Sequence, residues 1–271
     1  MSEKTAPKWA DLGVRSLSAV VLVPMVLAIV WFDGFVFTGF IVALGILMAI
    51  EWVKISFGEN KTQLLIHEVA AAALIMGSAT LSIVALAILS IVSWALQRKD
   101  GLSFWNLFGV AYIGLPILAL SILRDDAEFG LKAVVWCMAI VWSADVMAYF
   151  FGRIIGGPKL VPRISPKKTC AGMLGAVVGA VLASVLVSRF AHLAFWPLAG
   201  LAAVFAVVEQ GGDIFESAFK RHFGVKDSGN LIPGHGGVLD RIDGLIAVVL
   251  AAALVGVIHN PLSPAAGLMQ W

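Results

Sequence analysis

The sequence has few charged residues, and this scarcity sets the class of protein. Only 13% of its 271 residues are charged, whereas 60% are hydrophobic. Soluble domains are roughly a quarter charged and about half apolar, so the composition excludes an ordinary soluble domain. The apolar excess runs along the whole chain, as in a protein that crosses the membrane many times.

Cysteine and net charge are also scarce. The two cysteines, Cys137 and Cys170, have neither a paired nor a metal-ligand spacing, which excludes a disulfide framework and a cysteine-based zinc site. A net charge of +2 is too small to indicate a nucleic-acid partner. The basic N-terminus precedes an apolar run that has no small-residue cleavage site, so we expect an uncleaved first span.

Apolar runs of roughly 17 to 25 residues predict the membrane-spanning helices. We expect an all-α fold in a single transmembrane domain, 1–271, with N-terminal helices in 1–124 and the site-bearing helices and loops in 130–259. The expected spans are 15–32, 35–56, 64–78, 80–97, 104–123, 130–151, 171–191, 194–222 and 238–259.

The segment 64–97 could be one long helix or two short ones divided near Gly77. Lys and Arg favour cytoplasmic loops. With the segment divided and the N-terminus inside, all of the 19 Lys and Arg residues except Arg124, Lys132 and Arg189 lie on the cytoplasmic side. A single fused span would leave more of them outside than inside. We therefore predict about nine spans, a cytoplasmic N-terminus and a C-terminus outside.

Three predicted helices carry carboxylates close to one end. An apolar run ends at Asp145, another ends shortly before Asp213, and a third begins after Asp243. Each run is about 15 residues, or roughly 22 Å, and the hydrocarbon core is about 30 Å thick. We expect these three aspartates at similar depth below the inner boundary, with Asp240 just above them.

Carboxylates inside spans are costly and usually functional. Glu209, Asp213, Glu216 and Lys220 follow one another at spacings of a helix turn, so they share one face. The carboxylates could hold a hard cation such as Mg²⁺. Two other roles for these carboxylates stay open: structural ion pairs with nearby Lys and Arg, or an ion pathway through a transporter.

Two polar loops, 152–170 and 223–237, are expected on the cytoplasmic side. The first is rich in Lys and Arg, a composition that suits phosphate binding but is also typical of an ordinary positive-inside loop. The second ends in Gly236 and Gly237 just before a helix, where backbone N–H groups can face an anion. His235 could donate to a phosphate or merely cap the turn.

The stretch from Ser217 to Asp243 reads Ser217-x-Phe219-Lys220-Arg221, Lys226-Asp227-x-Gly229 and His235-Gly236-Gly237-Val238-x-Asp240-Arg241-Ile242-Asp243. This motif resembles the signature of the phosphatidate cytidylyltransferases (CDP-diacylglycerol synthases). The segment Ser165-Pro166-Lys167-Lys168-Thr169 is also similar to the family. One departure is Ala171, which stands where similar members usually carry Glu.

The resemblance implies transfer of CMP from CTP to phosphatidic acid, giving CDP-diacylglycerol and pyrophosphate. It further implies Mg²⁺, with room for a second cation, a homodimer, and a bacterial inner (plasma) membrane with the active site facing the cytoplasm. The alternatives are a cation-coupled transporter and another membrane phosphotransferase.

The resemblance also implies roles for individual residues. The metal candidates are Asp213, Asp240 and Asp145. The catalytic candidates are Asp213, Asp240, Lys226, Asp227 and Asp243. The candidates for binding substrate or phosphate are Ser165, Lys167, Lys168, Thr169, Ser217, Lys220, Arg221, His235, Gly236, Gly237 and Arg241.

Overall fold

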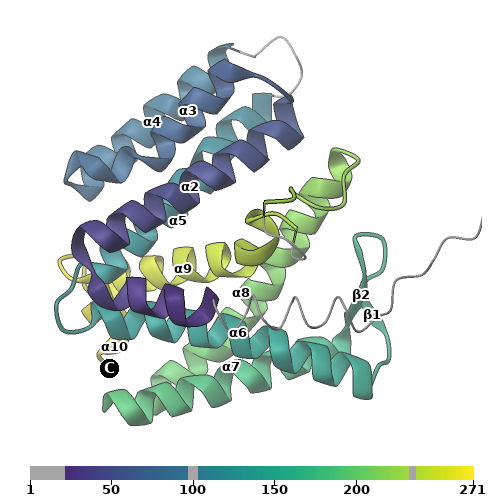
Figure 1. Cartoon of the computed structure of the whole chain (residues 1–271). Helices are drawn as coiled ribbons and strands as arrows, with labels where there is room; N and C mark the ends of the chain where they lie inside the picture. Colours follow the sequence, from purple (N-terminus) through teal and green to yellow (C-terminus); the bar gives the residue numbers. More distant parts are fainter. Residues whose placement is uncertain (1–21, 97–102, 232–235) are drawn as a thin grey trace, which may run out of the picture.

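Long apolar helices dominate the computed structural model, which describes residues 22–96, 103–231 and 236–271 (Figure 1). The helices are α2 (Gly34–Phe57), α3 (Lys61–Ala71), η1 (Ala73–Met76), α4 (Ala79–Leu96), α5 (Ser103–Arg124), α6 (Gly130–Ile154), α7 (Cys170–Ala191), α8 (Phe195–His222), α9 (Leu239–His259) and α10 (Pro264–Met269). A shorter apolar helix covers Leu22–Phe32.

Seven of the helices in the described part of the chain are long and apolar enough to cross a membrane, namely α2 and α4 to α9. Each agrees with an expected span to within about three residues. The expected span 15–32 begins outside the described residues. The protein is therefore a polytopic helical membrane protein, with seven full-length candidate spans in this part, and the total of about nine stays a prediction.

The expected span 64–78 is wrong as a regular spanning helix. The segment 64–97 does divide near Gly77, whose φ of 79° is left-handed. Its first half, however, is α3 with 11 residues, followed by the short η1. An α-helix of that length rises only about 17 Å, against a hydrocarbon core of about 30 Å.

The all-α prediction needs a second correction in the basic loop. Strands β1 (Lys159–Val161) and β2 (Ser165–Thr169) form a small antiparallel hairpin, with Lys159 opposite Thr169. The hairpin leads directly into α7, because the Thr169 hydroxyl accepts a hydrogen bond from the Gly172 N–H at 3.0 Å and so caps the helix. The hairpin is thereby fixed to the start of α7.

Helices α6 and α7 lie side by side in close contact (Figure 1). A Cβ at Gly175 would lie 2.5 Å from the Met147 carbonyl oxygen, and a Cβ at Gly179 equally close to that of Ser143. Small residues that let two backbones approach are the usual device for packing helices in a membrane. The glycine seam holds together the two helices that border the pocket described below.

An aromatic contact joins the N-terminal helices to α8. The Trp52 ring on α2 stacks on the Phe219 ring with centroids 4.0 Å apart, and both side chains are fully buried. The contact places α2 beside the polar half of α8.

The C-terminal segment, which the sequence leaves as an uncharged tail, folds back as the buried helix α10 against α9 and α6. Ser263 caps α10 and also donates a hydrogen bond to Asp126 in the α5–α6 loop.

Candidate active site

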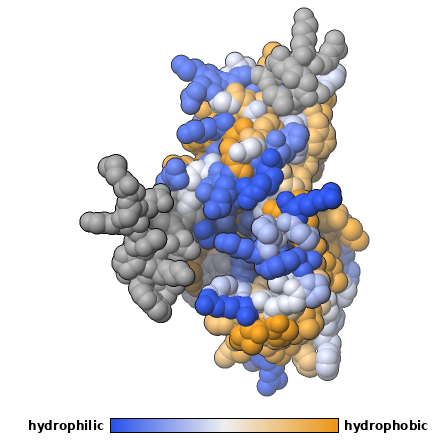
Figure 2. Space-filling view, turned by 90° about the vertical axis from the view of Figure 1, so that its right-hand side faces the viewer, coloured by the Kyte–Doolittle hydropathy of each residue, from blue (hydrophilic) through white to orange (hydrophobic). Residues whose placement is uncertain are grey.

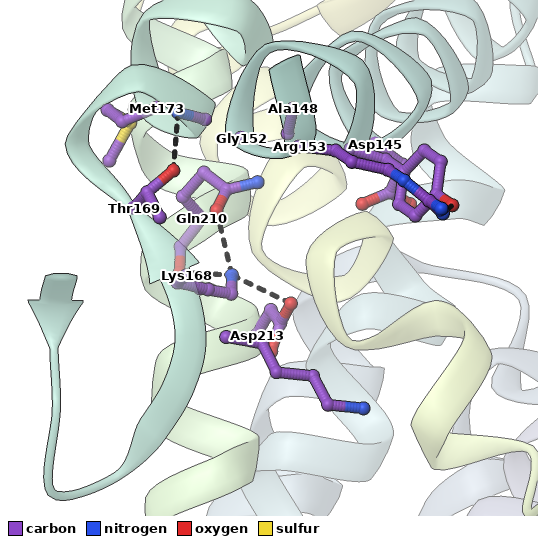
Figure 3. Close-up of a pocket in the computed structure, with 12 residues that line it drawn as sticks. Asp145, Ala148, Gly152, Arg153, Lys168, Thr169, Met173, Gln210 and Asp213 are labelled. Carbon is purple, nitrogen blue, oxygen red and sulfur yellow. Dashed lines mark hydrogen bonds and ion pairs between the residues drawn. The ribbon is translucent and has the colours of Figure 1, made fainter. Parts of the chain in front are cut away.

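Hydrophilic residues gather on the face of the molecule that carries the β1–β2 hairpin, and hydrophobic residues flank them (Figure 2). A pocket of about 330 Å³ is lined by residues of α6, β2, α7 and α8 (Figure 3), a volume within the range of small-molecule sites. The lining residues are Asp145, Ala148, Tyr149, Gly152, Arg153, Lys167, Lys168, Thr169, Gly172, Met173, Gln210 and Asp213.

Lys168 connects the hairpin to α8. Its Nζ lies 2.7 Å from Asp213 Oδ2 and donates to Gln210 Oε1 at 2.8 Å. The Gln210 amide in turn donates to Glu209 Oε2 at 2.8 Å. The basic loop and the acidic helix α8 therefore meet in one pocket.

Close helix crossing explains why the three aspartates meet. A Cβ at Gly212 would lie 2.8 Å from the Asp243 carbonyl oxygen, so α8 and α9 touch at this glycine. Asp243 consequently lies within electrostatic range of Asp213, and Asp145 from α6 lies within range of both. The structure thus brings Asp145, Asp213 and Asp243 within electrostatic range of one another, while their predicted common depth in the membrane stays a prediction.

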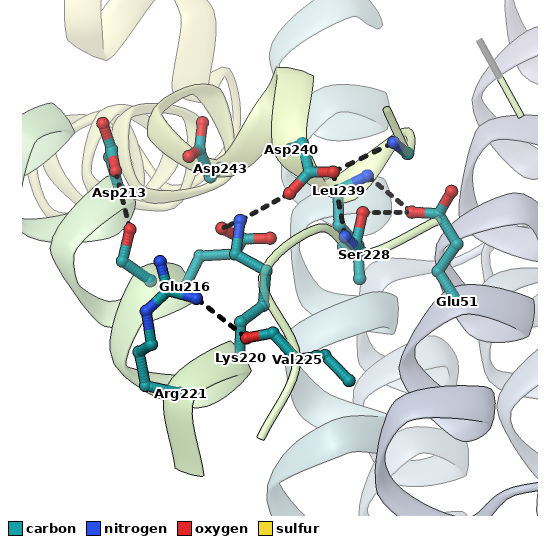
Figure 4. Close-up of polar contacts among 12 residues, drawn as sticks. Glu51, Asp213, Glu216, Lys220, Arg221, Val225, Ser228, Leu239, Asp240 and Asp243 are labelled. Carbon is teal, nitrogen blue, oxygen red and sulfur yellow. Dashed lines mark hydrogen bonds and ion pairs between the residues drawn. The ribbon is translucent and has the colours of Figure 1, made fainter. Parts of the chain in front are cut away.

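Asp240 belongs to a second cluster, which Glu216 connects electrostatically to Asp213 and Asp243 (Figure 4). Lys220 Nζ lies 2.5 Å from Glu216 Oε2 and also donates to Asp240 Oδ1. The other Asp240 oxygen accepts the backbone N–H groups of Ser228 and Gly237, both at 2.9 Å. Because both oxygens are occupied, Asp240 holds Lys220 and the segment between α8 and α9 in place.

The sequence led us to expect backbone N–H groups free to bind an anion at the start of α9, but the structure shows them already hydrogen-bonded. The Gly237 N–H goes to Asp240, while the N–H groups of Val238 and Leu239 donate to the Glu51 carboxylate at 2.8 and 2.9 Å. The expectation is therefore wrong for Gly237. For Gly236, whose φ is +85°, phosphate binding stays a prediction. His235 lies outside the described residues.

The remaining candidates are distributed around these clusters. Of the basic-loop candidates, Lys167, Lys168 and Thr169 line the pocket, whereas Ser165 does not. The Ser217 hydroxyl donates to Asp213 Oδ1 at 3.3 Å. The exposed candidates outside the pocket are Arg221, Lys226, Asp227 and Arg241, and Arg221 donates to the Val225 carbonyl at 3.0 Å.

The acidic residues of the pocket suit a magnesium ion only in part. Within the described ranges, no three His, Cys, Asp or Glu side chains are arranged to hold one metal ion. Mg²⁺, however, usually takes one or two carboxylates and completes its shell with water and substrate phosphates. Asp213, with Asp145 and Asp243 near it, offers the oxygen donors that such an ion prefers. Asp240, whose oxygens already accept three donors, fits less well.

Two buried residues of this region were missed from the sequence. Gln210 is buried and orients Lys168, and no sequence motif predicts this role. Glu51 is buried in α2, where a carboxylate inside an apolar run is itself a signal of function. Applying that rule to α2, as well as to α6, α8 and α9, would have found it.

Known proteins resemble the chain over most of its length. The model of the cytidylyltransferase family matches residues 13–259. A protein of Brucella abortus named phosphatidate cytidylyltransferase is 40% identical over 263 residues, covering 92% of this chain and 94% of the relative. Proteins of the same name from Staphylococcus epidermidis and Staphylococcus haemolyticus are both 38% identical over 165 residues, covering 59% of this chain and 62% of each relative.

Proposed function

The chain belongs to the cytidylyltransferase family, and from this premise we propose that it is a phosphatidate cytidylyltransferase. It transfers CMP from CTP to phosphatidate, giving CDP-diacylglycerol and pyrophosphate. The observation that supports the assignment to the pocket is the ion pair between Lys168 and Asp213, which joins a basic hairpin to an acidic helix. The relatives do not favour a transporter.

The basic residues of the pocket would bind the triphosphate. Lys167, Lys168 and Arg153 line it from β2 and α6, and together they offset the negative charge of a nucleotide. We propose that Asp213, with Asp145 or Asp243, holds Mg²⁺ together with the phosphate oxygens. When bound, such an ion neutralises the charge that develops on the phosphates during transfer.

The reaction requires that the two substrates are positioned and that the charge of their phosphates is neutralised, and it needs no covalent protein intermediate. An oxygen of the phosphatidate phosphate attacks the α-phosphorus of CTP and forms the new P–O bond. The bond between the α-phosphorus and the oxygen bridging to the β-phosphate breaks, and pyrophosphate leaves with that electron pair. Lys168 is placed to hold the departing phosphates, while α6 and α7 border the site with apolar surface for the lipid.

The location of the site follows from the same proposal. CTP is cytosolic and phosphatidate is a membrane lipid, so the pocket would lie at the cytoplasmic boundary of a bacterial inner membrane. The loops between α6 and α7 and between α8 and α9 lie on one side, since two spans separate them. They hold Lys159, Arg163, Lys167, Lys168 and Lys226, whereas the loops at the opposite ends of these helices hold no Lys or Arg, and this excess supports the orientation. We further propose a homodimer, on the family resemblance alone.

Incubation of the purified chain with labelled CTP, Mg²⁺ and phosphatidate tests the function. We expect labelled CDP-lipid, and chelation of Mg²⁺ should abolish it. Asp213→Asn should lower the rate by about 100-fold or more, since it weakens the carboxylate ligand proposed to hold Mg²⁺ at the reacting phosphates. Asp125→Asn, in the exposed α5–α6 loop, is the matched control and should keep normal turnover. No CDP-lipid from the wild type would refute the function, whereas normal turnover by Asp213→Asn would refute only its assigned role.

A further inference from the structure

Glu51 is a buried carboxylate that does not line the pocket. It lies on α2, and its side chain is enclosed by the segment between α8 and α9 (Figure 4). Its Oε1 accepts the Val238 N–H at 2.8 Å, and its Oε2 accepts the Ser228 hydroxyl and the Leu239 N–H, each at 2.9 Å. All three partners are donors, which is the set that an ionised carboxylate accepts.

Two glycines make room for this side chain. A Cβ at Gly229 would lie 2.8 Å from Glu51 Oε1, and a Cβ at Gly237 would lie 2.5 Å from the same oxygen. Real Cβ atoms essentially never lie this close to another atom, so any other residue would force the Glu51 carboxylate or the backbone of this segment to move. The glycines of this segment therefore serve close approach to a carboxylate from another helix.

Glu51 and Asp240 hold the same segment from two sides. The Ser228 hydroxyl donates to Glu51 while its N–H donates to Asp240, and the N–H groups of Gly237, Val238 and Leu239 are shared between the two carboxylates. Glu51 also supplies the negative charge that stabilises a helix N-terminus. It thus fixes the first turn of α9, the turn that carries Asp240 and leads to Asp243.

We propose that Glu51 is a positioning residue for the cytidylyl transfer, acting through the start of α9. The inference rests on the proposed function of the pocket, and it extends the active site to the N-terminal helices. Residues that orient the groups at a reacting centre typically change activity by about 10- to 100-fold when they are replaced. We expect an effect of this size at Glu51, although it lies outside the pocket.

The conservative variants of Glu51 separate an electrostatic role from a packing role. Glu51→Gln keeps the shape but turns an amide NH₂ toward groups that are themselves donors. Glu51→Asp shortens the side chain but keeps two accepting oxygens. If Glu51 acts as an acceptor, Glu51→Gln loses about 10- to 100-fold in kcat and Glu51→Asp loses less. If Glu51 only fills space, the isosteric Gln is the better substitute, and that order would overturn the proposal.

Amide hydrogen exchange gives a readout that does not depend on activity. In Glu51→Gln we expect peptides covering 226–239 to exchange about tenfold faster, with no change in 130–191. Uniformly faster exchange would indicate a merely structural role and would refute positioning. Ser56→Ala is the control, since Ser56 lies on the same helix, is buried, and has a hydroxyl without a hydrogen-bond partner. A wild type without CDP-lipid product would refute the proposed function, and exchange alone would then decide the role of Glu51.

Discussion

Replacement of Lys220 by methionine should be among the most destabilising single changes in the polar half of the protein. The Lys220 side chain is 11% exposed and lies between Glu216, at 1%, and Asp240, at 10%. Methionine keeps much of the volume and removes the positive charge that both carboxylates contact. Glu216 and Asp240 would then face each other across an apolar side chain.

The magnitude follows from the distances and the burial. At 2.5 Å between Lys220 Nζ and Glu216 Oε2, the gross attraction is about 7 kcal/mol with an effective dielectric constant of about 20. Desolvation of the ammonium offsets part of this. Breaking a buried pair by removing one partner typically costs about 3–5 kcal/mol, because the remaining charge stays buried without compensation. A loss of that size would lower the unfolding midpoint by roughly 6 to 20 °C.

Thermal unfolding of the detergent-purified chain measures this effect. Lys220→Met should unfold well below the wild type, whereas Lys159→Met, at an exposed position in β1, should be close to it. The double variant Glu216→Gln/Lys220→Met should recover part of the loss, since it removes the uncompensated carboxylate. A Lys220→Met midpoint within about 2 °C of the wild type, or a double variant less stable than Lys220→Met, would refute the reasoning.

Two further predictions concern other parts of the fold. Gly175→Ala should cost about 1–3 kcal/mol, since its Cβ would meet the Met147 carbonyl oxygen, while Gly200→Ala, which meets nothing within 4 Å, should be neutral or stabilising in thermal unfolding. Burial alone would raise the pKa of Asp126. Hydrogen bonds from the Ser263 hydroxyl and from the Phe129 and Glu128 N–H groups, together with the charge of Lys132, outweigh burial and lower this pKa. Its ionised form therefore adds stability above the ordinary aspartate value of about 4, and this stability is lost as the pH falls through the lowered pKa. Asp126→Asn should unfold earlier than wild type at pH 7, and the gap between their midpoints should narrow as the pH is lowered below about 4. Equal midpoints at pH 7, or a gap that does not narrow in acid, would contradict this.

The length of apolar runs was enough to place most helices. The bounds of α8 and α9 agree closely with prediction, because a span is set by bilayer thickness and its ends by the first polar residues. The same reasoning failed at α3. That helix buries Gln63 and His67, and a Ser93 side chain from α4 is among the partners that satisfy Gln63. Hydrogen-bond partners of this kind for buried polar side chains come from tertiary contacts, which the pattern of apolar residues does not predict.

The sequence could predict the depth of each site residue along its own helix, but not which residues of different helices pair. Run lengths predicted a similar depth for Asp145, Asp213 and Asp243, since each helix gives an independent estimate, and their mutual proximity in the structure agrees with that prediction. The division into two clusters was not predictable, because the Lys168–Asp213 and Lys220–Asp240 pairs depend on how α8 faces its neighbours. At the start of α9 a local rule for helix N-termini was overridden twice: Asp240 accepts the Gly237 N–H, and Glu51, which is 187 positions from Val238 in the sequence, accepts the Val238 N–H.

The cap that Thr169 provides for α7 has a consequence for how this chain can change over evolution. Lys168 enters the pocket immediately before the residue that starts the helix, so its direction is set by chain length as much as by residue type. One residue inserted between Lys168 and Gly172 would turn the lysine away from Asp213 even if every side chain were kept. Insertions should instead be tolerated at the hairpin tip, around Pro162 and Arg163, where both residues are exposed. Length variation among functional relatives should therefore be confined to the tip of the hairpin.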